Sequence, residues 1–160
     1  MALASPTMGV GRNRRALFAF EQFAVVPDVL VLGKALGGGM PMGAFVSSHE
    51  RMQLLTHDPV LGHITTFGGH PIPCVAGIAA LEVLLEERLA ENAQRMGALF
   101  KKLLVHQAIK EIRGTGLMLA VELGDADKVQ RVVMGCLGRG LLGFWFLSCP
   151  TAFRIAPPLT

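Results

Sequence analysis

Apolar positions in the first half of the chain fall into two patterns. Short continuous apolar runs at Val29–Leu32 and Ala44–Ser47 predict two strands, the first of them buried. From residue 73 to residue 104, apolar residues recur at helical spacing instead. This stretch predicts either one long helix or two helices that meet near residues 89–92. The charges beside its apolar stripe, which include Glu82 and Glu86, are expected on an exposed face.

The second half predicts a smaller mixed unit. A helix is expected over residues 125–137, ended by Gly138. Four strands are expected at residues 110–113, 117–122, 141–147 and 153–156, the first two joined by a turn at 114–116. The pattern therefore indicates part of a larger α/β unit over residues 1–88, followed by a small α+β unit over residues 89–160.

Composition narrows the class of protein. The chain has 160 residues, of which 51% are hydrophobic and 17% charged, with a net charge of +3. This is enough apolar material for a packed core, and no dense basic stripe with interleaved aromatics indicates nucleic-acid binding. The longest charge-free run near the C-terminal end, residues 140–153, is too short for a membrane helix and contains Pro150. Three scattered cysteines form no disulfide framework, so a cytoplasmic location is expected.

The most informative single residue is Lys34. It follows the apolar run Val29–Leu32 and precedes three glycines at residues 37–39. A lysine in apolar surroundings at the end of a strand is suited to act as a nucleophilic amine, with a pKa lowered by a dry pocket. A solvated turn is the alternative that the lysine alone leaves open. A Walker motif is absent, because no glycine occupies position 28 and Ala35 follows the lysine.

The motifs around Lys34 resemble the lysine segment of the class III aminotransferases. The segment runs from Pro27-Asp28 through Leu32-Gly33-Lys34-Ala35-Leu36-Gly37-Gly38-Gly39 to Pro41 and Gly43-Ala44. Other matches, in the family's order, are Gly9-Val10-Gly11-Arg12, Leu17 to Glu21, His63 to Pro71, Ile112 to Met118 and Phe153 to Leu159. The resemblance implies a fold type I large domain with a mostly parallel sheet, followed by a small C-terminal domain. It also implies the cofactor pyridoxal 5′-phosphate (PLP).

The resemblance assigns roles to individual residues. Lys34 is expected to hold PLP as a Schiff base and to move a proton during transamination between an amino acid or ω-amine and a 2-oxo acid. Thr66, with Thr65 beside it, is expected to bind the phosphate of PLP in a neighbouring subunit, which implies a homodimer. Arg154 is expected to bind the substrate carboxylate, and this favours an aminotransferase over an aminomutase. Arg113 is expected to be structural.

Two departures from the family qualify these expectations. The aspartate that pairs with the pyridine nitrogen is missing, because Ala4-Ser5-Pro6-Thr7 aligns with the family's Asp-Glu-Val-Gln. His70 replaces an asparagine, which puts any hydrogen bond made there in doubt. The upstream half of the family's cofactor pocket is also missing, so a truncated and weakly active chain is expected. The alternative is a non-catalytic remnant that dimerises or binds PLP weakly or not at all.

Two further kinds of site are disfavoured. A metal site at His57, His63 and His70 lacks a supporting carboxylate or cysteine cluster, so no metal is expected. A phosphate- or nucleotide-binding module built on glycines 37–39 lacks a helix cap and an acidic ribose partner in register.

Overall fold

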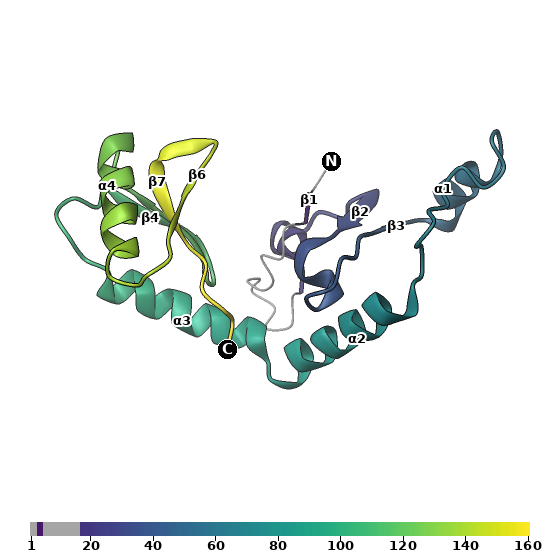
Figure 1. Ribbon diagram of the computed structural model, residues 1–160, viewed down its shortest axis with the longest axis horizontal. Helices are drawn as coiled ribbons and strands as arrows, with labels where there is room; N and C mark the ends of the chain where they lie inside the picture. The colour runs from purple at the N-terminus through teal and green to yellow at the C-terminus, as the bar shows by residue number, and fades with distance from the viewer. Residues whose placement is uncertain (1–2, 5–16) are drawn as a thin grey trace. The chain divides into compact units, whose positions relative to one another are not determined.

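The computed structural model describes residues 3–4 and 17–160 of the chain (Figure 1). The chain divides into two compact units, Met1–Leu89 and Ala90–Thr160. Each unit has its own sheet, with three strands in the first and four in the second. Within the described ranges, no helix is both long and apolar enough to cross a membrane.

The sheet of the first unit is built around β2 (Val29–Leu32). β3 (Ala44–Ser47) pairs with it in antiparallel orientation, so both predicted strands are confirmed at their predicted bounds. β1 (Leu3–Ala4) pairs with β2 in parallel orientation, with Leu3 opposite Val31.

The helices of the first unit include one long element. They are the 3-10 helices η1 (Ala19–Phe23), η2 (Lys34–Gly37) and η3 (Leu54–Thr56), and the α-helices α1 (His49–Gln53) and α2 (Pro71–Glu86). Ser48 caps α1, because its hydroxyl accepts the backbone N–H of Arg51 at 3.3 Å. The side chain of Arg51 also reaches Asp28, with Nη2 to Oδ1 at 2.6 Å, and thereby ties α1 to the start of β2.

Small residues on one face of α2 let η2 approach its backbone closely. A Cβ added at Gly38 would overlap the carbonyl oxygen of Ala76, and one added at Gly77 would lie 2.6 Å from the carbonyl oxygen of Leu36. Side chains of any size at these contacts would separate the two elements. The approach fixes the turn that follows Lys34 against a rigid helix.

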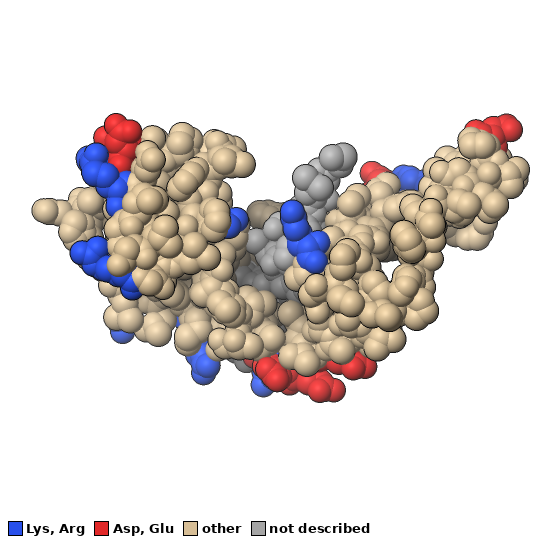
Figure 2. All heavy atoms as spheres, in the orientation of Figure 1, with Lys and Arg blue, Asp and Glu red and all other residues tan. Residues whose placement is uncertain are grey.

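The rest of the surface of α2 is largely apolar. Ile72, Val75 and Ile78 are exposed although they are large and hydrophobic. Acidic side chains gather at the C-terminal half of the helix (Figure 2), where Glu82 and Glu86 are exposed as predicted. Helix-forming sequence continues to residue 103, but α2 ends at Glu86 and α3 (Leu89–Leu103) begins anew. The predicted alternative of two helices is therefore correct.

The second unit has a four-stranded antiparallel sheet in the order β4-β5-β7-β6. The strands are β4 (Glu111–Thr115), β5 (Met118–Glu122), β6 (Phe144–Phe146) and β7 (Cys149–Ile155). Thr115 pairs with Met118, so the turn of the first hairpin consists of Gly116 and Leu117. The predicted turn at 114–116 was wrong by two residues, because Gly114 and Thr115 belong to β4.

The core of the second unit lies between the sheet and α4 (Ala126–Leu137). Val121 and Val129 are at most 1% exposed, and a buried valine contributes roughly 1.5–3 kcal/mol. Asp125 caps α4 by accepting the N–H of Lys128 at 2.9 Å, which agrees with the predicted start of this helix. On α3, Gly97 lies so close to the carbonyl of Gly116 that a Cβ there would overlap it.

Candidate active site

Lys34 is separated from the end of β2 by Gly33 alone and begins η2. Its φ of 58° is left-handed, a conformation that costs a residue with a Cβ about 1–2 kcal/mol. Its side chain is exposed, and no carboxylate among the described residues pairs with it. The described residues alone do not enclose the amine, so the dry pocket around it stays a prediction.

A series of tight turns holds Lys34 in this strained conformation. The N–H of Leu36 donates to the carbonyl of Gly33 at 3.2 Å, and the N–H of Gly38 donates to the carbonyl of Ala35 at 3.0 Å. Gly38 is itself left-handed, with φ 58°, which glycine adopts without steric cost. The backbone at Gly38 approaches the backbone of α2 closely.

Thr65 and Thr66 lie in the exposed loop of residues 65–70 that leads into α2. The N–H of Gly68 donates to the carbonyl of Thr65 at 3.2 Å, which closes a turn around Thr66. Within the described part of the chain, neither the hydroxyl nor the N–H of Thr66 makes a hydrogen bond. Both donors therefore remain open to an anion.

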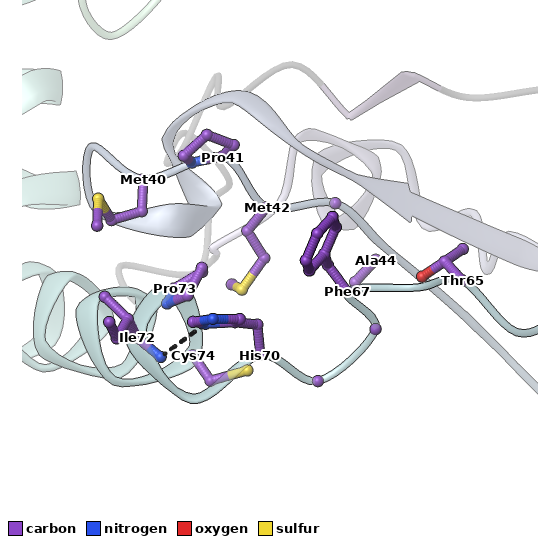
Figure 3. A pocket seen from close by; sticks show the side chains of 13 residues that line it. Met40, Pro41, Met42, Ala44, Thr65, Phe67, His70, Ile72, Pro73 and Cys74 are labelled. Carbon is purple, nitrogen blue, oxygen red and sulfur yellow. Dashed lines mark hydrogen bonds between the residues drawn. The ribbon is translucent and has the colours of Figure 1, made fainter.

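The 65–70 loop forms one wall of an open cavity of about 740 Å³ (Figure 3). Thr65, Phe67 and His70 line it from the loop, together with residues of the 40–44 segment and of the first turn of α2. Neither Lys34 nor Thr66 is among its lining residues. Lys34 and the threonine pair therefore belong to the same unit, but only Thr65 of the three lines this particular cavity.

His70, which departs from the family pattern, makes a hydrogen bond of its own. Its Nδ1 accepts the backbone N–H of Ile72 at 3.3 Å, and it is the N-cap of α2. Its ring also lies 6.4 Å from the ring of Phe67, centroid to centroid. Across residues 3–4 and 17–160, no three His, Cys, Asp or Glu side chains gather in a way that would hold a metal ion.

Arg154 lies on β7, in the second unit. Its guanidinium carbon is 5.5 Å from the centroid of the Phe144 ring on the neighbouring strand β6. No described aspartate or glutamate forms an ion pair with it. A guanidinium with an aromatic support and no acidic partner retains its donors for a carboxylate from outside the chain.

Arg113 lies on the opposite side of β5 from Arg154, since both pair with Ala120. Its Nη2 is 3.0 Å from Glu122 Oε2 and 3.2 Å from the sulfur of Cys149, and its Nη1 is 3.6 Å from Glu111. The hydrogen bond with Glu122 is the main reason why the pKa of Arg113 is raised. These contacts occupy its guanidinium and support the predicted structural role.

Glu122 belongs to a network that sequence reasoning missed. A hydrogen bond with Thr151, and then those from the Gly124 N–H and from Arg113, lower the pKa of its carboxyl. Glu122 also pairs with Glu111 directly across the hairpin. Like charges opposite each other are destabilising unless a cation lies between them. The positive side chain of Arg113, two residues along β4, was the signal that could have indicated this network.

Two sequence motifs lie outside the described residues. The segment that aligns with the family's aspartate, residues 4–7, is described only at Ala4, and the Gly9-Val10-Gly11-Arg12 match is not described.

Comparisons with known proteins agree with this arrangement. The family model for aminotransferase class III matches residues 7–160. This chain belongs to the class III aminotransferases. The acetylornithine aminotransferase of Caldanaerobacter subterraneus subsp. tengcongensis is 38% identical over 139 residues, which cover 84% of this chain and 34% of that protein. The predicted family is therefore confirmed.

Solved structures of class III aminotransferases have a similar fold. An ornithine aminotransferase from Toxoplasma gondii has 37% identity and a TM-score of 0.79, over 96% of this chain and 37% of that one. An acetylornithine aminotransferase from Elizabethkingia anophelis has 34% identity and a TM-score of 0.76, over 97% of this chain and 39% of that one. These likenesses confirm the fold type I prediction. The chain spans about a third of the length of the relatives it matches.

The described residues fit the PLP cofactor of the class III aminotransferases. The aldehyde of PLP requires an amine that no carboxylate holds as an ammonium ion, and Lys34 has no such partner among the described residues. The phosphate requires hydroxyl and N–H donors without other partners, and Thr66 provides both. The roles of Lys34, Thr65, Thr66 and Arg154 remain predictions at this point.

Proposed function

We propose that the protein containing this chain transfers an amino group from an amino acid or ω-amine to a 2-oxo acid, with Lys34 as the catalytic amine. The observation that carries the proposal is the placement of Lys34. It lies at the end of a strand, in a left-handed conformation and without an acidic partner among the described residues. Backbone strain of this kind is concentrated at functional sites, where surrounding structure maintains it.

Lys34 would perform two tasks in this reaction. Its Nζ would bind the cofactor aldehyde. Once the substrate amine has displaced it, Nζ would take a proton from the substrate carbon and deliver it to the cofactor carbon. PLP supplies an electron sink for the charge that this proton transfer leaves behind. The turns from Gly33 to Gly38 would keep the amine at a fixed position during both tasks.

Thr66 and Thr65 would bind the cofactor phosphate of a second copy of the chain. The support is that both are exposed and that the donors of Thr66 have no partner in the described residues. The exposed apolar side chains of α2, which begins directly after the 65–70 loop, are suited to burial against another chain. A homodimer is therefore part of the proposal, and cross-linking in solution tests it.

Arg154 would bind the substrate carboxylate through the two terminal nitrogens of its guanidinium group. The support is the contrast with Arg113, whose guanidinium is occupied by Glu122 and Glu111. A cytoplasmic location is also proposed, since Cys74, Cys136 and Cys149 are all free thiols, as a reducing compartment would maintain them.

Borohydride trapping tests the proposal on the chain itself. The purified chain is incubated with PLP, reduced, digested and analysed by mass spectrometry for the modified lysine. Lys34→Ala removes the proposed amine, and Lys102→Ala removes an exposed lysine on α3 as a matched control. We expect the label on Lys34 in the wild type and in the Lys102 variant, together with an absorbance band that the Lys34 variant lacks.

An equal spread of label over all exposed lysines would contradict the proposal. It would favour the alternative expected from the sequence, a remnant without a specific cofactor site. Where Lys34 is labelled selectively, amino-group transfer from ornithine to 2-oxoglutarate then measures whether the chain turns over.

A further inference from the structure

The first turn of α2 contains an unusual arrangement of backbone donors. Pro71 and Pro73 occupy its first and third positions and have no N–H. The N–H of Cys74 is satisfied by the carbonyl of His70 at 3.3 Å. Ile72 therefore has the only N–H in this turn that needs a partner from outside the helix, and Nδ1 of His70 accepts it at 3.3 Å.

This hydrogen bond fixes the protonation state of the His70 ring. Nδ1 accepts, so it carries no proton, and the proton of the neutral ring is on Nε2. A protonated ring would present an N–H to the N–H of Ile72. It would also place a positive charge at the positive end of the helix dipole. The cap therefore exists only while His70 is neutral.

His70 also holds the loop that contains the threonine pair. Its own N–H donates to the carbonyl of Phe67 at 3.2 Å, one turn after the N–H of Gly68 donates to the carbonyl of Thr65. The rings of Phe67 and His70 are tilted against each other. The 65–70 loop thus joins α2 through a residue whose backbone and side chain are both engaged (Figure 3).

The groups that face His70 offer no compensation for a positive charge. Among the described residues that line the cavity around it, no side chain is an aspartate, glutamate, lysine or arginine. Cys74, from the same first turn of α2, is the other titratable side chain in this lining. Elsewhere the lining consists of glycine, threonine and apolar residues. An imidazolium formed here would have no acidic partner among these lining residues.

We propose that His70 is a positioning residue whose neutral imidazole holds the 65–70 loop to the first turn of α2, and that acidification releases this loop. This proposal rests on the proposed function at one point: Thr66, which lies in this loop, is the residue expected to bind phosphate. The cap itself depends on the geometry of His70 and Ile72 alone.

Two measurements on the full chain test the cap directly. The ¹⁵N chemical shifts of the His70 ring report which nitrogen bears the proton, and we expect Nε2. Hydrogen exchange of the Ile72 amide, expressed as a protection factor corrected for pH, reports the hydrogen bond. We expect this factor to fall about fivefold between about pH 8 and about pH 5, the factor that corresponds to a typical N-cap.

Matched variants separate titration from structure. His70→Asn provides a strong N-cap that does not titrate, so protection of Ile72 is expected at both pH values. His70→Ala is expected to lose protection at both. A proton on Nδ1 in the wild type, or equal protection of Ile72 at both pH values, would overturn the proposal. The ring measurement decides the question even if the alanine variant does not fold.

A titration with sulfate, an anion like phosphate whose charge does not change between these two pH values, distinguishes this inference from the proposed function. The Thr66 amide signal is followed at both pH values in the wild type and in the asparagine variant. An anion-induced shift of the Thr66 amide signal that weakens at the lower pH in the wild type alone supports both the cap by His70 and the phosphate-binding role of Thr66. A working cap at His70 without any shift at Thr66 supports the cap and contradicts the phosphate role. A shift at Thr66 that is independent of pH in the wild type contradicts control of the loop by His70.

Discussion

Arg154 and Phe144 lie directly opposite each other on strands β7 and β6, with the guanidinium carbon 5.5 Å from the centroid of the ring. The ring is about half exposed, so it supports the guanidinium from one side and leaves its edge open. A long flexible side chain loses less rotamer entropy on binding when it is already held in place. The pair therefore holds the guanidinium in place, as the proposed carboxylate-binding role of Arg154 requires.

Replacing this ring is expected to weaken carboxylate binding without unfolding the sheet. Phe144→Leu keeps an apolar side chain but removes the cation–π contact, so affinity for a dicarboxylate such as glutarate should fall about two- to fivefold. Isothermal titration of the chain with glutarate measures the change. Phe144→Trp should retain the affinity.

Phe146→Leu is the matched control for this experiment, because Phe146 lies on the same strand and pairs with Cys149 instead of Arg154. Its affinity for glutarate should stay at the wild-type value. An equal loss in both leucine variants would mean that β6 acts through general packing and not through the Arg154 contact.

The lowered pKa of Glu122 predicts that acid destabilises the second unit. Because the hydrogen bond with Thr151 and those from Gly124 and Arg113 hold its pKa below the ordinary value, its stabilisation is fully present above about pH 5. It is lost as the pH falls through the folded-state pKa. Trp145 is the only tryptophan in the sequence and lies on β6 of this unit. Urea unfolding followed by its fluorescence should show the loss between about pH 5 and about pH 3.

Glu122→Gln should flatten this pH dependence and lower the stability at neutral pH. Asp127→Asn is the control, since Asp127 is an exposed carboxylate on α4 of the same unit. It should leave the slope with pH close to that of the wild type. An unchanged slope in the Glu122 variant would exclude Glu122 as the source of the acid sensitivity.

Two glycines in helices of the second unit should respond to alanine in opposite directions. At Gly97 of α3, a Cβ would overlap the carbonyl oxygen of Gly116 in the hairpin turn, so Gly97→Ala should cost about 1–3 kcal/mol. At Gly135 of α4, the nearest atom to an added Cβ is the flexible Arg139 Nη1 at 3.6 Å. Gly135→Ala should stabilise by about 0.5–1 kcal/mol, because glycine is a poor helix former. Urea unfolding followed by Trp145 fluorescence measures both, and a neutral Gly97→Ala would contradict the close approach.

Local sequence signals predicted the elements that they determine. β2, β3 and α4 were expected within a residue of their observed bounds, because each is marked by an apolar pattern and a capping or turn residue at its end. The hairpin turn was misplaced because Gly114-Thr115-Gly116 contains two glycines, and only pairing with β5 decides which of them turns the chain. Register is a property of two strands together, so the pattern of one strand does not determine it.

The sequence identified the residues of the candidate site, but it did not predict their exposure, backbone conformation or hydrogen-bond partners. Lys34 was identified from its place after an apolar run, but its exposure and left-handed φ depend on turns and on packing against α2. The guanidinium of Arg113 forms an ion pair with Glu122, and only the register of the β4–β5 hairpin brings these two side chains together. The cap by His70 was within reach of the sequence, because Pro71 and Pro73 leave Ile72 as the N–H in need of a partner.

The turn after Lys34 provides a test of how the site is held. Gly38→Ala introduces both left-handed strain at φ 58° and overlap with the carbonyl oxygen of Ala76 on α2. Gly39→Ala introduces left-handed strain at φ 97°, with no atom within 4 Å of the added Cβ. Gly39→Ala should lower the free energy of unfolding by about 1 kcal/mol or slightly more. Gly38→Ala should lower it further, because η2 must also move away from α2.

The difference between these two variants isolates the contact with α2. If that contact positions Lys34, selective borohydride labelling of Lys34 by PLP should drop in Gly38→Ala and persist in Gly39→Ala, at a temperature where both remain folded by circular dichroism. Equal labelling in the two variants would show that the strand end alone orients the amine. Packing against α2 would then contribute only stability, because moving η2 would leave the reactive group where it is.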